Sequence, residues 1–112
     1  IHIDGTFPET IEPSIVGYSV GAWKDGKLHV QTKGFETGFL EVIGGRSTRS
    51  VPHSDQMEIA ETFYIDAAGE LVQEYTITDP VYLAKPHSHL NKSVRTDDAF
   101  TPYACDDLTV EQ

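Results

Sequence analysis

The sequence has few basic residues, a single cysteine and no long apolar run. Cys105 alone cannot form a disulfide within the chain, and one thiol does not indicate a redox compartment. No apolar run approaches the roughly twenty residues of a transmembrane helix, so we expect no membrane span. Eight Lys and Arg residues stand against 18 Asp and Glu residues, for a net charge of −10. Nucleic acid is therefore not an expected partner, because binding it depends on neutralising phosphates.

The composition is that of one soluble domain. The 112 residues are 38% hydrophobic and 23% charged, which suits a single modest core. We expect one β-rich domain over residues 1–112, with residues 1–13 as an extended lead-in, because that stretch combines two prolines with a glycine and acidic residues. The first residue is isoleucine, and we expect any signal peptide to be missing from this sequence.

The pattern along the chain predicts strands throughout. An Asp25-Gly26 pair joins the β-rich runs SIVGYSVGAW and KLHVQTKGF, which is a strong hairpin signal. The runs MEIAETFYID and LVQEYTITDP predict a second hairpin, with its turn at Ala68-Gly69. No helical period is present. We expect an all-β, mostly antiparallel fold of about six to eight strands, either a small lipocalin-like barrel or a sandwich.

Three other segments carry expectations. Phe39 to Ile43 is a short apolar piece, and the residues from Gly44 to Gln56 predict a polar loop, either functional or a plain connection. Residues 81–90 predict a strand interrupted at Pro86. The run FTPYACDDLTV predicts a last short strand.

Glu61 is the most informative charged residue. Counting by twos along its strand places it on the same face as Ile59 and Phe63, which predicts an inward-facing carboxylate. Such a group either finds partners or has a raised pKa, and a raised pKa suits acid-base chemistry. The alternative is a structural ion pair with one of three arginines: Arg46, Arg49 or Arg95.

His53 and Asp79 complete the candidate catalytic set. His53 follows a proline just before the Glu61 strand, so it could move a proton to or from that carboxylate. Asp79 shares the parity of Tyr75 and could orient a ligand, although an Asp before Pro80 more commonly caps a turn. A solvent-exposed turn histidine is the alternative for His53.

Two further groups suggest ligands. His87 and His89 project from one face if their strand continues, and with His53 they could supply the nitrogens of a zinc or iron site. Tyr75, Trp23 and Tyr64 are candidates for contact with an apolar or aromatic molecule, and core packing is the alternative for each.

Several stretches together resemble a widespread group of short bacterial exported proteins of unknown function: IHIDG, GYSVGAWKDGKLHVQTKGF, HSDQMEIAETFYID, YTITDPVYLAKP and YAC. The resemblance implies a β-rich periplasmic or secreted domain and brings no activity. It lends weight to Ser54 and Cys105 beside the candidate catalytic set. It gives none to the histidine pair, since the group usually has tryptophan at the position of His87. It also departs at Thr62, where the group usually has arginine.

These observations favour one function and leave two open. The leading hypothesis is an exported domain that binds a small apolar or aromatic molecule without a cofactor, with acid-base catalysis of a lyase, isomerase or hydrolase type by His53 and Glu61 as an extension. A metal-binding protein that uses His87, His89 and His53 is the second. A non-catalytic interaction module is the third, in which exposed edge strands pair with a partner or form a homodimer.

Overall fold

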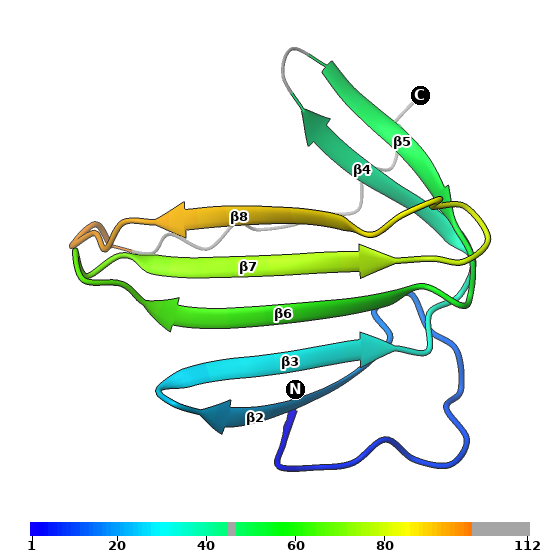
Figure 1. Cartoon of the computed structure of the whole chain (residues 1–112), viewed down its shortest axis with the longest axis horizontal. Coiled ribbons are helices and arrows are strands. Elements are labelled where there is room, and N and C mark those ends of the chain that lie inside the picture. The colour runs from blue at the N-terminus through cyan, green and yellow to red at the C-terminus, as the bar shows by residue number, and fades with distance from the viewer. Residues whose placement is uncertain (45–46, 100–112) are drawn as a thin grey trace, which may run out of the picture.

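The computed structural model describes residues 1–44 and 47–99, and in these residues every regular element is a β-strand. Six strands form one sheet in the order β1-β2-β3-β6-β7-β8, and two form a separate hairpin (Figure 1). The strands are β1 His2–Ile3, β2 Tyr18–Lys24, β3 Lys27–Lys33, β4 Gly38–Gly44, β5 Ser47–His53, β6 Glu58–Ile65, β7 Leu71–Thr78 and β8 His87–Ser93. The all-β, mostly antiparallel fold is therefore confirmed.

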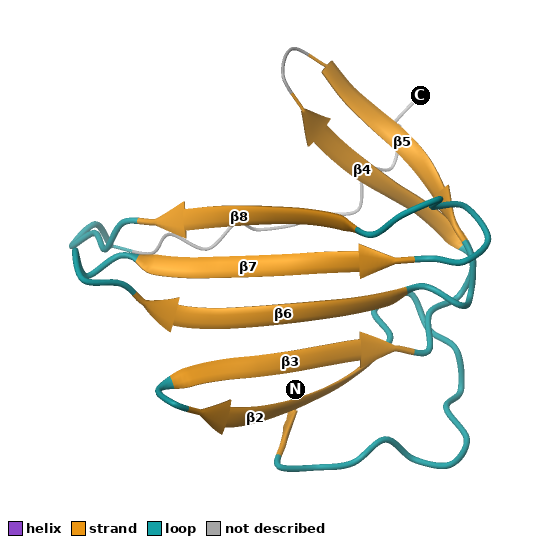
Figure 2. Ribbon diagram, viewed as in Figure 1, coloured by secondary structure: helices purple, strands orange, loops and turns teal. Residues whose placement is uncertain are grey.

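The main sheet is open within the described residues. Its edges are β1, which lies parallel to β2, and β8, which pairs only with β7. The hairpin β4–β5 projects away from the sheet near the end where β3 stops and β6 starts (Figure 2). Among the described residues no helix could cross a bilayer.

Both predicted hairpin turns are present. Asp25 and Gly26 have φ angles of 53° and 76°, the left-handed pair that a two-residue type I′ turn requires. The second turn has Gly69 at φ 80°. The Asp66 carboxylate there accepts hydrogen bonds from the amides of Ala68 and Glu70, each at 2.9 Å. Both turns are thus formed by residues within the turn itself, which is why local sequence predicts them.

The predicted polar loop after Gly44 is wrong for most of its length. Residues Ser47–His53 form β5, which pairs antiparallel with β4 from Gly38↔His53 to Gly44↔Ser47. A hairpin outside the main sheet needs no alternation of apolar and polar residues. The polar sequence of β5 therefore did not predict a strand. Pro52 is tolerated because, among the described residues, β5 pairs on one side only.

The segment before β8 also differs from expectation. The predicted strand begins only at His87, after Pro86, and residues 80–86 form turns. The carbonyl of Asp79 accepts the Leu83 amide at 2.9 Å, which bends the chain directly after β7. The predicted strand in FTPYACDDLTV and its Cys105 lie outside the described residues.

The main sheet has one apolar and one polar face. The apolar face holds the odd-numbered residues of β2, β6, β7 and β8 and the even-numbered residues of β3, because directly paired residues share a face. Its only Asp, Glu, Lys or Arg is Glu61. The polar face carries six such residues: Lys24, Lys27, Lys33, Glu58, Glu74 and Lys92.

The core covers one end of the apolar face. Phe35, Met57 and Ile77 form a buried cluster, with Leu40, Ile59, Tyr75 and Leu83 packed against it. At the other end Trp23 and Ile65 are each 64% exposed and Leu71 is 43% exposed. The apolar face is thus buried where the turns gather and open toward the β6–β7 turn.

Candidate functional site

A row of four side chains crosses the apolar face at its middle. Val30, Glu61, Tyr75 and His89 lie directly opposite one another on β3, β6, β7 and β8. Side chains at such positions are about 5 Å apart at Cβ, close enough for neighbours in the row to contact one another. We call these four residues the Glu61 row.

Glu61 is half-buried and has one hydrogen-bond donor in the described structure. Its Oε2 accepts the side-chain amide of Gln73 at 2.8 Å. The prediction that Glu61 shares a face with Ile59 and Phe63 is therefore confirmed, but the carboxylate is less enclosed than a core position would be. An ionised carboxylate has about four acceptor positions, so most of its capacity is open to another donor.

Tyr75 lies between the two histidines of β8. Its ring centroid is 6.3 Å from that of His87 and 5.8 Å from that of His89, with tilted planes. Both histidines are exposed on the strand that ends the sheet, and they share a face as the spacing predicts. A ring flanked in this way offers a flat aromatic surface beside the Glu61 carboxylate.

Asp79 has a structural position. It is 3% exposed, and its carboxylate accepts the Ser54 amide at 2.6 Å, the Ser54 hydroxyl at 2.7 Å and the Val81 amide at 2.9 Å. We call this contact between Asp79 and Ser54 the Asp79 clip. It fastens the turn before β6 to the turn after β7.

The clip keeps Asp79 ionised. Burial on its own would raise the pKa of the carboxyl group, but the hydrogen bonds from Ser54, Val81 and Tyr82 outweigh it and hold the pKa below its usual range. A carboxylate that is saturated with donors and ionised near neutrality is a weak base. Asp79 thus fits the turn-capping alternative better than the orienting role.

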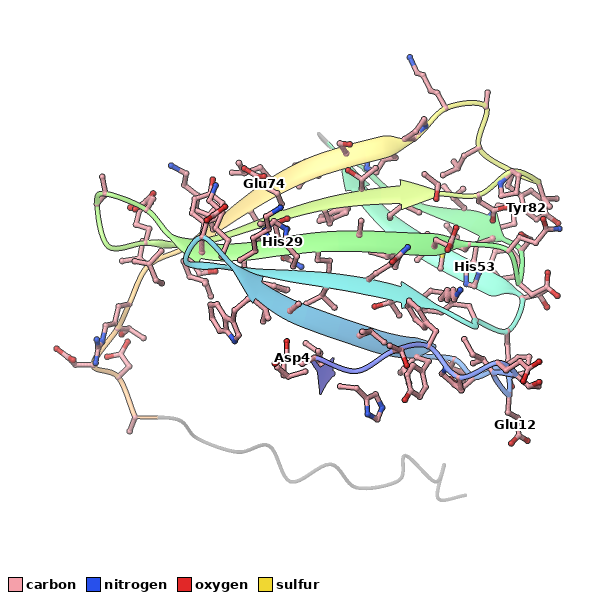
Figure 3. The ribbon with its side chains drawn as sticks, turned by 60° about the horizontal axis from the view of Figure 1, so that its bottom comes forward. Asp4, Glu12, His29, His53, Glu74 and Tyr82 are labelled. Carbon is pink, nitrogen blue, oxygen red and sulfur yellow. The ribbon has the colours of Figure 1, made fainter. Side chains whose placement is uncertain are left out.

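His53 lies at the base of the β4–β5 hairpin (Figure 3). Its Nδ1 is 3.1 Å from the Ser54 carbonyl oxygen, and its ring stands edge-on to Phe35 at a centroid distance of 6.1 Å. Within the described chain His53, Glu61 and Asp79 make no hydrogen bonds to one another, and each has its own partners.

The three candidate ligand-contacting aromatics are on two faces. Trp23 and Tyr75 lie on the apolar face, and Tyr64 lies on the polar face. The Tyr64 hydroxyl donates to Glu74 at 2.9 Å, which raises the pKa of the phenol, and the Lys27 ammonium lies 4.2 Å from the ring centre. One site on the apolar face therefore includes Trp23 or Tyr75 but not Tyr64.

The described residues bring together no three His, Cys, Asp or Glu side chains that could hold a metal ion. Zinc or iron bound through His87, His89 and His53 stays a prediction, which the metal content of protein purified without added metal would test. Of the arginines proposed as partners of Glu61, Arg46 lies outside the described residues and the Arg49 side chain is likewise not described. Arg95 lies beside Ile65 and Leu71 at the open end of the sheet.

Sequence reasoning missed Gln73 as the partner of Glu61 and His89 as a member of the row. The parity that places Tyr75 inward also places Gln73 inward, so the donor could have been found by the same count. The alignment of His89 could not, because it depends on where β8 starts after Pro86.

Comparisons with known proteins add no relatives: neither the family models, the curated proteins nor the solved structures give a match. The resemblance to short exported bacterial proteins, and the periplasmic or secreted location it implies, stay predictions.

Proposed function

We propose that this domain binds a small apolar or aromatic molecule that carries a hydrogen-bond donor, on the apolar face beside the Glu61 row. The observation that carries the proposal is the position of Glu61. It is the one charged side chain of that face, it is held by Gln73 at 2.8 Å, and it lies directly opposite Tyr75. A hydroxyl, amide or ammonium of the guest would donate to the carboxylate while its apolar body contacts the rings.

The surroundings of Glu61 support an apolar guest. Val30 on one side is 3% exposed, and Phe63 is the next residue on the same face of β6.

Binding is favoured over catalysis by the separate positions of the predicted catalytic residues. Asp79 is engaged by the clip, and His53 contacts the Ser54 carbonyl. A mechanism that moves a proton between His53 and Glu61 would need a contact that the described structure does not contain. The described sheet is open. Its closure into a barrel or sandwich that fully encloses the guest is a further part of this proposal.

The test uses the single tryptophan of the chain as a reporter. Trp23 lies on the apolar face and is 64% exposed, so a guest on that face changes its emission. We expect 2-naphthol, an aromatic alcohol, to quench Trp23 saturably. Glu61→Gln should weaken this binding by about tenfold or more, because the hydrogen bond to a charged acceptor is lost.

The matched control is Glu58→Gln. Glu58 is an exposed glutamate on the same strand but on the polar face, so the same chemical change there should leave 2-naphthol binding unaltered. Quenching that never saturates, or an equal loss in both variants, would refute the proposed site.

A further inference from the structure

We infer that the open half of the apolar face is the contact surface for a second copy of this chain, so that two sheets pack face to face. The open half is the part from the Glu61 row to the β6–β7 turn. The inference goes beyond the proposed function, because it concerns the partner of the whole face and not the guest of one carboxylate.

Exposure of large apolar side chains is the first observation. Trp23 and Ile65 are 64% exposed and Leu71 is 43% exposed, on three different strands of one continuous face. Leu28 and Phe63 lie between them and are half-buried. Contiguous apolar surface of this kind, as distinct from single scattered residues, marks a contact surface.

The charge distribution makes this face the one where a second copy meets the least repulsion. The chain carries a net charge of −10, so two copies repel each other over most of their surface. The apolar face is the exception, since its strands contain one charged residue where the polar face contains six. Two copies that meet through the open half bring almost no like charges together.

Area is the third observation. Two rows that cross five strands and a third that crosses three, at about 4.8 Å between strands and about 6.7 Å between rows, outline roughly 400 Å² of flat surface. The side chains on that outline present a larger accessible surface than the outline itself, and an interface of this size is smaller than the roughly 800 Å² that each partner contributes to a standard one. One small molecule would leave most of it in water, whereas a second sheet covers it.

The geometry of such a pair is that of a β-sandwich. Two sheets that pack through apolar faces lie about 10 Å apart, with the side chains of the two faces interdigitated. A two-fold axis makes the interface isologous, so every substitution on the face occurs twice in the dimer. The β4–β5 hairpin projects from the end of the sheet that lies opposite the β6–β7 turn, away from the open half (Figure 1).

Sedimentation velocity over a wide range of protein concentration is the test. We expect the full chain to dimerise with a dissociation constant in the micromolar range, as a small interface of this kind supports. Ile65→Lys should weaken the dimer by at least tenfold, since it places two unpaired ammonium groups in the interface. The matched control Ile15→Lys changes a residue just after the lead-in that is 83% exposed, and it should leave dimerisation unaltered.

Circular dichroism establishes that both variants keep the β fold, and Leu71→Lys repeats the test if Ile65→Lys does not fold. A chain that stays monomeric at every concentration overturns the inference, as does an Ile65→Lys variant that dimerises like the unchanged protein, which would indicate pairing through a strand edge. A monomer whose Trp23 is shielded from acrylamide would also overturn it, because another part of the same chain would then cover the face. Failure of 2-naphthol to bind at protein concentrations low enough for the chain to be monomeric would count against the proposed function alone, because no second copy then covers the Glu61 row.

Discussion

At the scale of single residues, the carboxylates of this chain have different tasks according to the donors around them. Asp79 is saturated by Ser54 and Val81, whereas Glu61 accepts one donor, Gln73. Asp66 shapes a turn, and its pKa is lowered mainly by the Glu70 amide, with Lys92 adding an ion pair at 3.3 Å. Of these three, Glu61 is the one with capacity left for a guest.

The clip gives a prediction for stability. Asp79→Asn replaces one acceptor oxygen by an amide group that cannot accept, so a donor of Ser54 or Val81 is left buried without a partner. We expect a loss of about 2 to 4 kcal/mol in the free energy of unfolding, measured by urea denaturation near neutral pH. Asp55→Asn, the same change at an exposed position next to Ser54, should alter stability by less than about 0.5 kcal/mol.

Comparison of the unchanged protein with Asp79→Asn also tests how the stability depends on pH. Because the folded pKa of Asp79 lies below its unfolded value, ionised Asp79 stabilises the fold fully above the unfolded pKa. That contribution fades as the pH falls from about 5 through the lowered folded pKa. The stability difference between the unchanged protein and Asp79→Asn should therefore shrink on acidification, and a difference that stays constant down to about pH 2 would contradict the role of the clip.

At the scale of elements, the β2–β3 turn depends on backbone conformation alone. Gly26 has a φ of 76°, and a Cβ built on it would meet no atom within 4 Å. Gly26→Ala should therefore cost about 1 kcal/mol through backbone strain, with no steric clash. Asp25→Asn is the control, because asparagine adopts the left-handed region readily. Thermal unfolding of both variants measures the difference, and an equal effect would rule out the backbone explanation.

The strands that sequence predicts are those with a chemical signal of their own. The Asp25-Gly26 turn and the alternation in β6 and β7 are local, so the hairpins and the faces of their residues could be predicted from sequence. Strand β5 could not, because Ser47–His53 pairs outside the main sheet and carries no alternating pattern. The start of β8 depends on turns after Asp79 that involve contacts with Ser54, which is 25 positions earlier in the chain.

The candidate site divides in the same way. Glu61, Gln73 and Tyr75 belong to one hairpin, so their common face follows from counting. The separation of His53 from Glu61 follows from the direction of the β4–β5 hairpin, and nothing in the residues near His53 states that direction. Sequence alone therefore joined groups that the fold keeps apart.

At the scale of the whole molecule, stability is concentrated in the middle of the main sheet. The described core has five buried apolar side chains, and four of them lie on or beside β3, β6 and β7: Val30, Met57, Val72 and Ile77. The β4–β5 hairpin is a separate two-stranded sheet. Two-stranded hairpins are marginal in water without further packing.

Hydrogen exchange should show this difference. We expect the paired amides of β3, β6 and β7 to exchange through global unfolding, and those of β4 and β5 to exchange faster by at least tenfold through local opening. Exchange followed by mass spectrometry on peptides from each strand measures this. Equal protection of the hairpin and the central strands would show that the hairpin is held by contacts beyond its own pairing.

The Asp79 clip also has a consequence for the register in which β6 and β7 pair. Strand side chains alternate, so β6 and β7 aligned one position out of step would turn Glu61 or Tyr75 to the opposite side. The clip lies beside the point where Glu58 meets Thr78, at the open end of that hairpin. A misaligned chain would move the Asp79 oxygens away from Ser54 and leave the carboxylate without these donors, so the clip favours the observed alignment over a shifted one.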